Sequence, residues 1–226
     1  MNGKWGLLTG AVVAGTMLAS VGSAQAGALG MQLSSGATTV TINDNGAGDT
    51  ANTTAGTIVF FGAVGGFNTN VTTGLGLNTL APPYPHLDLN SVNVSGAAGT
   101  LTIMLSETGL SGAGVLNFLT AWGGTTNGSV SLDAYVNLDD GLFSTTGTKV
   151  ADLDSAGPVF GLNATAGAAT DASYSVTLVW TITHTAAGQV TSGDAEFRQV
   201  PEPMTLSLLG LGLVGLGAAT RRRKAA

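Results

Sequence analysis

The sequence predicts an all-β domain, an antiparallel β-sandwich or jelly roll, flanked by an N-terminal signal helix and a C-terminal transmembrane helix. Three observations indicate this class. Thr and Ser alternate with apolar residues along short segments, Gly, Asn, Asp and Pro separate these segments, and helical periodicity is nearly absent from the interior of the chain. Eight to ten short strands without intervening helices in the 174 residues from 27 to 200 are typical of two packed antiparallel sheets.

The individual strands follow from the same alternation. It is clearest at 100–106 and 174–183, where Thr or Ser occupies every second position over most of the segment. The candidate strands are 38–42, 56–64, 67–73, 86–94, 100–106, 129–138, 159–163, 174–184 and 189–197. Gly65 and Gly66 predict a tight hairpin between two strands, and so does the short link 186–188. The segment 115–122 is the one candidate helix, although its apolar residues fit a strand equally well.

Composition and charge exclude several classes of protein. The chain has no cysteine, which removes disulfides and thiolate metal sites. Charged residues make up only 9% of its 226 residues, so disorder caused by excess charge is not expected. Between residues 27 and 200, two basic residues, Lys149 and Arg198, stand against twelve acidic ones, a net charge of −10. A domain this acidic lacks the clustered Lys and Arg that bind nucleic acid phosphates.

The N-terminus has the three parts of a secretory signal peptide. Lys4 supplies a positive charge, residues 5–21 carry none, and Ala24-Gln25-Ala26 gives an A-x-A cleavage site. We therefore assign residues 1–26 to a signal peptide that signal peptidase cuts after Ala26, once the Sec translocon has exported the chain.

The C-terminus, residues 200–226, combines three further signals. Pro201-Glu202-Pro203 precedes residues 204–220, a 17-residue stretch without an ionisable group. As a helix this stretch spans about 25 Å, at the short limit for crossing a bilayer core. Arg221, Arg222, Arg223 and Lys224 follow it, and basic clusters of this kind remain on the cytoplasmic side of the inner membrane.

This tail resembles the PEP-CTERM sorting signal of bacterial surface proteins. The resemblance implies export, transient anchoring in the inner membrane through the 204–220 helix, cleavage by an exosortase near Pro201-Glu202-Pro203, and release to the cell surface or extracellular matrix. Proteins with this tail are typically found in Gram-negative bacteria that make exopolysaccharide. An ordinary single-pass anchor that is never cut is the alternative. The predicted domains are thus the signal peptide at 1–26, a β-sandwich at 27–199 and the sorting signal at 200–226.

The interior offers little catalytic chemistry. The two histidines, His86 and His184, lack partners at metal-ligand spacing, and we expect each to have a surface or capping role. Oxygen ligands are more plentiful: Asp44, Asn45 and Asp49 stand around glycines, as ligands of Ca²⁺ do. Ordinary turn chemistry explains the same residues, since Asn, Asp and Gly accept left-handed backbone angles. We expect no other cofactor.

Aromatic residues in loops could bind carbohydrate, because the apolar faces of sugars stack on aromatic rings. Tyr84 and Trp122 adjoin proline or glycine in expected loops and are the candidates for such stacking. Trp180 lies in the most apolar strand and is expected in the core.

Three functions are compatible with these features. The first is a non-enzymatic surface or matrix protein, processed by exosortase and associated with exopolysaccharide or biofilm. The second is a carbohydrate-binding or adhesive module, assisted or not by calcium. The third, a polysaccharide hydrolase, requires two carboxylates facing one cleft, a pairing that the sequence does not show.

Overall fold

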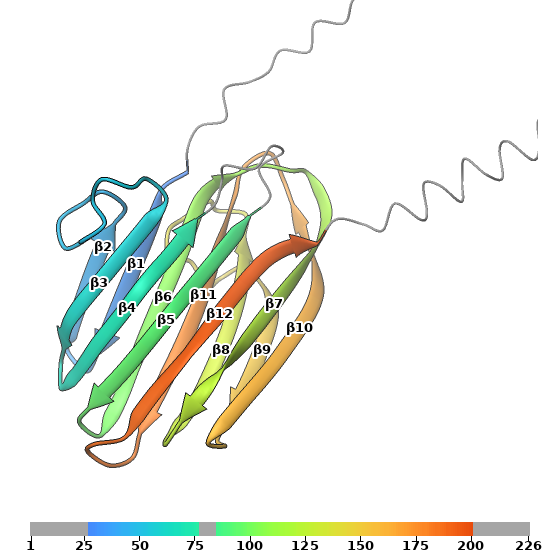
Figure 1. Ribbon diagram of the computed structural model, residues 1–226. Coiled ribbons are helices and arrows are strands. Elements are labelled where there is room, and N and C mark those ends of the chain that lie inside the picture. The colour runs from blue at the N-terminus through green and yellow to red at the C-terminus, as the bar shows by residue number, and fades with distance from the viewer. Residues whose placement is uncertain (1–26, 77–84, 201–226) are drawn as a thin grey trace, which may run out of the picture.

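A computed structural model of the protein describes residues 27–76 and 85–200, and these residues form twelve β-strands and no helix (Figure 1). The strands are β1 (Leu29–Ser35), β2 (Thr38–Asn43), β3 (Thr57–Val64), β4 (Phe67–Gly76), β5 (His86–Gly96), β6 (Gly99–Leu110), β7 (Gly114–Thr126), β8 (Ser129–Asn137), β9 (Thr148–Ser155), β10 (Val159–Thr170), β11 (Tyr174–His184) and β12 (Val190–Val200). The prediction of an all-β fold is confirmed. The signal helix within 1–26 and the transmembrane helix at 204–220 lie outside the described residues, and within those residues no helix could cross a membrane.

The strands form two six-stranded antiparallel sheets that pack face to face as a β-sandwich (Figure 1). Sheet A has the order β2-β1-β6-β11-β8-β9, and sheet B has the order β10-β7-β12-β5-β4-β3. The last strand of the described chain, β12, lies inside sheet B, paired with β7 on one side and β5 on the other. Sheet B is therefore complete only when residues 190–200 are in place.

Alternation along the strands builds the core. In β11, Val176, Leu178, Trp180 and Ile182 point inward and are buried, while Thr181 and Thr183 point to the outer face of sheet A. Successive side chains in a strand point to opposite faces, so one strand supplies both the core and a polar surface. The core location predicted for Trp180 is confirmed.

The two predicted hairpins have different outcomes. Gly65 and Gly66 join β3 to β4 in a two-residue turn, with Val64 paired to Phe67, as expected. The hairpin predicted at 186–188 is wrong, because β11 belongs to sheet A and β12 to sheet B. This link instead crosses between the sheets, and the Gly188 N–H donates to the Gly96 carbonyl at 2.8 Å.

The strand alternative at 115–122 is confirmed. This segment is part of β7 and not a helix, because β10 and β12 supply hydrogen-bonding partners on both sides. β10 runs to Thr170, beyond the predicted end at residue 163. β1 and β9 were not predicted. β9 is an edge strand of sheet A and contains Lys149, Asp152 and Asp154. These charged residues interrupt the pattern of apolar and polar residues by which the other strands were predicted.

Candidate functional site

The outer face of sheet B carries a shallow groove of about 690 Å³ over β5, β12, β7 and β10. Its floor is low because the outward positions of β7 and β10 hold small residues, Ala121, Gly123 and Gly161. Pairing places Glu196 beside Ala121, and Asp194 beside Gly123. Polar side chains of β5 and β12 therefore stand along one side of this low floor, and Asn163 of β10 stands beside Ala121 on the other.

The polar side of the groove is a network of charged residues. Asp88 on β5 lies directly opposite Glu196 on β12. Glu196 Oε1 lies 3.2 Å from His86 Nε2 and 3.3 Å from Arg198 Nε. These contacts hold the Glu196 carboxylate in place at the groove, with His86 on the neighbouring strand β5 and Arg198 two residues along β12.

Asp88 has a different environment. Burial raises the pKa of its carboxyl group, the nearby His86 lowers it, and the carboxylates of Glu196 and Asp194 raise it further. The net result is a pKa above the usual range for aspartate. Asp88 thus offers the groove a carboxyl group that accepts hydrogen bonds when ionised and donates one when protonated.

A shift in strand pairing presents Asp194 to the groove. The register between β12 and β5 changes between Gly193 and Ala195, and Ser91 has a left-handed φ of 52° at this point. The Ser91 N–H donates to Asp194 Oδ1 at 2.7 Å. Bulges of this kind re-aim side chains, and here the irregularity fixes the carboxylate of Asp194 at the end of the groove.

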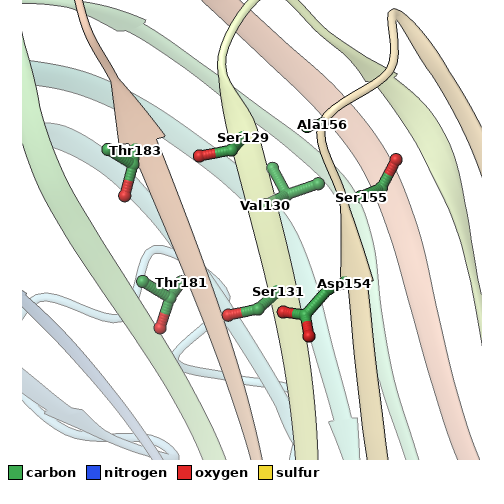
Figure 2. A pocket seen from close by; sticks show the side chains of 8 residues that line it. All are labelled: Ser129, Val130, Ser131, Asp154, Ser155, Ala156, Thr181 and Thr183. Atoms are coloured by element: carbon green, nitrogen blue, oxygen red, sulfur yellow. The ribbon is translucent and has the colours of Figure 1, made fainter.

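A second hollow, of about 310 Å³, lies on the outer face of sheet A and is lined mainly by hydroxyl groups (Figure 2). Strand pairing aligns Thr102, Thr181, Ser131 and Asp154 in one row across β6, β11, β8 and β9. Thr100, Thr183 and Ser129 form the next row, in which the Thr100 and Thr183 hydroxyls lie 3.2 Å apart. This surface is polar but, apart from Asp154, uncharged.

The predicted carbohydrate residues do not form an exposed platform among the described residues. Trp122 lies within β7, not in a loop, and its side chain is only 3% exposed. Its ring packs against Phe160 and Trp180 in the core, so no ring face is open to a ligand. The expected loop position of Trp122 is wrong because β7 continues to Thr126. Tyr84 lies outside the described residues.

The residues predicted for calcium close a loop between β2 and β3. Asp49 is buried, and its carboxylate accepts the N–H groups of Ala51 at 2.9 Å, Val59 at 3.0 Å and Asn45 at 3.1 Å. Asp44 Oδ2 accepts the Gly56 N–H at 2.8 Å, and Asn45 has a left-handed φ of 58°. These contacts fit the alternative of turn chemistry. Within 27–76 and 85–200, no group of three or more His, Asp or Glu side chains is placed to hold a metal ion.

The histidines lie in unlike places. His86 is partly exposed at the groove, as its predicted surface role requires. The surface or capping role predicted for His184 is wrong, because this side chain is buried in the interior, where its Nε2 lies 3.0 Å from Thr191 Oγ1. In the inward and outward alternation of side chains along β11, position 184 faces the core.

Sequence reasoning missed the groove for an identifiable reason. Polar residues at every second position in 86–90 and 192–198 do signal an outward strand face. The pairing that brings Asp88 beside Glu196, however, joins segments more than a hundred residues apart. The alternation of polar and apolar residues shows which side chains of a strand face outward, but it does not show which strand lies beside it in the sheet.

The sorting residues Pro201, Glu202, Pro203, Arg221, Arg222, Arg223 and Lys224, and the cleavage residues Ala24 and Ala26, lie outside the described residues. Comparison with protein families tests the tail directly. Residues 199–224 match the family described as the PEP-CTERM protein-sorting motif. The chain therefore carries this sorting motif, as the sequence predicted, and the motif begins where β12 ends at Val200. Such a motif implies exosortase-dependent sorting to the cell surface.

No curated protein is significantly similar to this chain. Among solved structures, the CBM22-1 xylan-binding domain of Paenibacillus barcinonensis Xyn10C is 15% identical, over 66% of this chain and 89% of that one, with a TM-score of 0.33. The CBM22-1–GH10 modules of Clostridium thermocellum xylanase 10B, complexed with xylohexaose, are 11% identical, over 55% and 26% of the two chains, with a TM-score of 0.28. The Arthrobacter globiformis T6 isomalto-dextranase, complexed with panose, is 13% identical, over 63% and 23%, with a TM-score of 0.29. These values establish neither a shared ligand nor a shared activity.

Proposed function

We propose that this chain is an exported protein that exosortase processes and delivers to the cell surface or extracellular matrix, where it has a non-enzymatic role in organising exopolysaccharide. The sorting motif at 199–224 is the observation that carries this proposal. The motif follows β12 without a spacer, so the sandwich is held within a few residues of the membrane until the tail is cut. Cleavage then frees the domain from the bilayer.

Replacing Pro201, Glu202 and Pro203 together by alanine in the native host tests this function. The wild-type chain should lose its tail and collect in the surface or extracellular fraction. The triple variant should keep the tail and remain in the inner membrane, because the apolar helix and arginines are unchanged. Thr205→Ser, two residues beyond the motif, is the matched control and should be processed as the wild type is. Equal processing of the triple variant would contradict the proposal.

A second candidate function is carbohydrate binding at the sheet B groove. The groove combines a floor of small residues with polar groups along one side, an arrangement that lets a flat ligand approach and form hydrogen bonds. Asp88, Asp194 and Glu196 supply carboxylates, whereas Arg198 is the one permanent cation beside them within 27–76 and 85–200. This charge disfavours acidic polysaccharides, and the expected ligand is a glycan without acidic groups.

Binding of the processed protein to a glycan array, with and without chelator, tests this second function. Ala121→Leu should reduce retention about tenfold or more, because it fills the floor of the groove. Thr181→Leu, in the hollow on sheet A, should leave retention unchanged. Groove binding would be contradicted if no glycan retained the wild-type protein, or if both variants lost retention equally. Release of reducing ends from a polysaccharide would contradict the non-enzymatic role.

A further inference from the structure

We propose that removal of the signal peptide after Ala26 creates an α-ammonium group at Gly27 that binds the buried carboxylate of Glu107. This inference rests on the export step of the proposed function, and it assigns to Glu107 a role that neither the sorting motif nor the groove uses. The new charge would thus tie the mature N-terminus to the interior of the sandwich.

Glu107 is a buried acid without a partner. Its side chain is 2% exposed, and its Oε2 atom makes no hydrogen bond within the described residues. It lies on the inward face of β6, opposite Leu29 of β1 and Val176 of β11. An ionised carboxylate in such a place is costly unless a positive group is paired with it.

The side chains of the domain supply no such cation. Between residues 27 and 200, Lys149 and Arg198 are the only lysine and arginine. Lys149 binds Asp133 at 3.0 Å and Asp152 at 3.4 Å, and Arg198 binds Glu196. Apart from the two histidines, the α-amino group of a chain that starts at Gly27 is therefore the remaining group of the mature domain that can carry a positive charge near neutral pH.

Strand pairing brings Gly27 close to Glu107. Leu29, the first paired residue of β1, lies directly opposite Glu107, and Gly27 precedes Leu29 by two residues. Residues two positions away from a cross-strand partner are about 7–8 Å from its neighbour in antiparallel strands, within reach of a long side chain. The chain is fixed here by paired contacts: the Thr108 N–H donates to the Ala28 carbonyl at 3.0 Å, and the Ala28 N–H donates to the Thr108 hydroxyl at 3.1 Å.

Only glycine fits at position 27. A Cβ atom there would lie 1.6 Å from the Thr108 carbonyl oxygen, far inside any real contact. The backbone of the first mature residue therefore sits directly against β6, and its amino group cannot be far from the strand that carries Glu107. In the uncut chain this nitrogen is a neutral amide and offers no charge.

The other titratable groups at this end of the sandwich are acids. The Tyr174 hydroxyl on β11 has no hydrogen-bond partner among the described residues, and its pKa is raised first by burial and then by the carboxylate of Glu107. Asp140 accepts the Gly109 N–H at 2.7 Å and a hydrogen bond from the Ser173 hydroxyl. Burial alone raises the pKa of Glu107 to about 7. An ammonium group at Gly27 would lower that pKa and stabilise the folded, mature chain.

The test compares four exported, processed chains. Two start at Gly27, with Glu107 or with Glu107→Gln, and two carry a Ser-Gly insertion after Ala26 that moves the ammonium group two residues away. Intact mass establishes each N-terminus, and urea unfolding at pH 7 gives the equilibrium constant. In the chain with Glu107, the insertion should raise the equilibrium constant of unfolding about tenfold or more, since one pKa unit corresponds to a factor of ten. In the Glu107→Gln chain, the insertion should change this constant little.

Equal effects of the insertion in both backgrounds would overturn the inference. A second measurement needs no substitution in the core: the α-amino group of the wild-type chain should acylate at least about tenfold more slowly than that of the chain with the insertion, because an ion-paired ammonium group is a poor nucleophile. Equal rates would also overturn it. If the exported chain retains residues 1–26, the export step of the proposed function fails. If the chain starts at Gly27 but shows no coupling, only this inference fails.

Discussion

Trp122 and Trp180 meet edge to face inside the sandwich, with ring centroids 5.7 Å apart and ring planes at 89°. Trp180 belongs to β11 of sheet A and Trp122 to β7 of sheet B, so this contact joins the two sheets. Phe160 packs against both rings, and its ring centroid lies 4.5 Å from that of Trp122 and 6.4 Å from that of Trp180. These three aromatic residues therefore stabilise the centre of the sandwich.

Substitution Trp180→Ala should lower the free energy of unfolding by about 3–5 kcal/mol, because it leaves a large cavity between the sheets. Urea unfolding followed by circular dichroism measures the change. Phe61→Ala is a control, since this ring is 60% exposed and its loss should cost about 0.5 kcal/mol or less. Equal losses in the two variants would show that the indole is not a core residue.

Substitution Asp49→Ala should destabilise the protein by about 3 kcal/mol, because three backbone N–H groups lose their acceptor. The same unfolding assay measures this cost. Calcium and chelator should both leave the wild-type midpoint unchanged, since Asp49 already accepts hydrogen bonds on both oxygens. A rise of the midpoint with calcium, lost in Asp49→Ala, would restore the alternative of a calcium site.

The contribution of His184 to stability should fall when the pH drops below about 6.5, the ordinary pKa of histidine, because burial lowers the pKa of this side chain. The folded state then binds fewer protons than the unfolded state. The stability due to the neutral ring is present above the unfolded pKa and is lost as pH falls toward the folded pKa. In His184→Gln, the difference between urea midpoints at pH 7.5 and pH 5 should shrink. An unchanged difference would assign the acid sensitivity to other groups.

Two glycines in the strands of sheet B should respond differently to alanine. A Cβ at Gly193 would lie 2.3 Å from the Gly123 carbonyl oxygen, whereas a Cβ at Gly161 would meet nothing within 4 Å. Gly193→Ala should therefore cost about 2 kcal/mol or more, through forced movement of the backbone. Gly161→Ala should change stability by less than about 1 kcal/mol. Thermal unfolding separates the two, and similar midpoints would contradict the close approach of β12 and β7.

The fold class could be predicted because alternation is a local property. Thr181 and Thr183 on the outer face, and Trp180 and Ile182 inside, follow directly from the order of residues in β11. The sheet to which a strand belongs is not local. The link at 186–188 looks like a hairpin turn, yet β12 inserts between β5 and β7 in the opposite sheet, where its inward Ala195 and Phe197 are buried.

The candidate sites show the same limit. The sorting motif is contiguous in the chain, so its order of residues was sufficient to find it. The groove depends on Asp88 and Glu196, which only long-range pairing brings together. Trp122 was misplaced because a glycine pair at 123 and 124 resembles a loop, although these glycines allow β12 and Phe160 to pack closely against β7.

Intact mass spectrometry of the processed protein from its native host is the decisive measurement for export and sorting. The expected mass corresponds to a chain that begins at Gly27 and ends near Pro203, together with any attached glycan. A protein that retains residues 204–226 after delivery, or that is found in the cytosol with both ends intact, would contradict exosortase-dependent sorting.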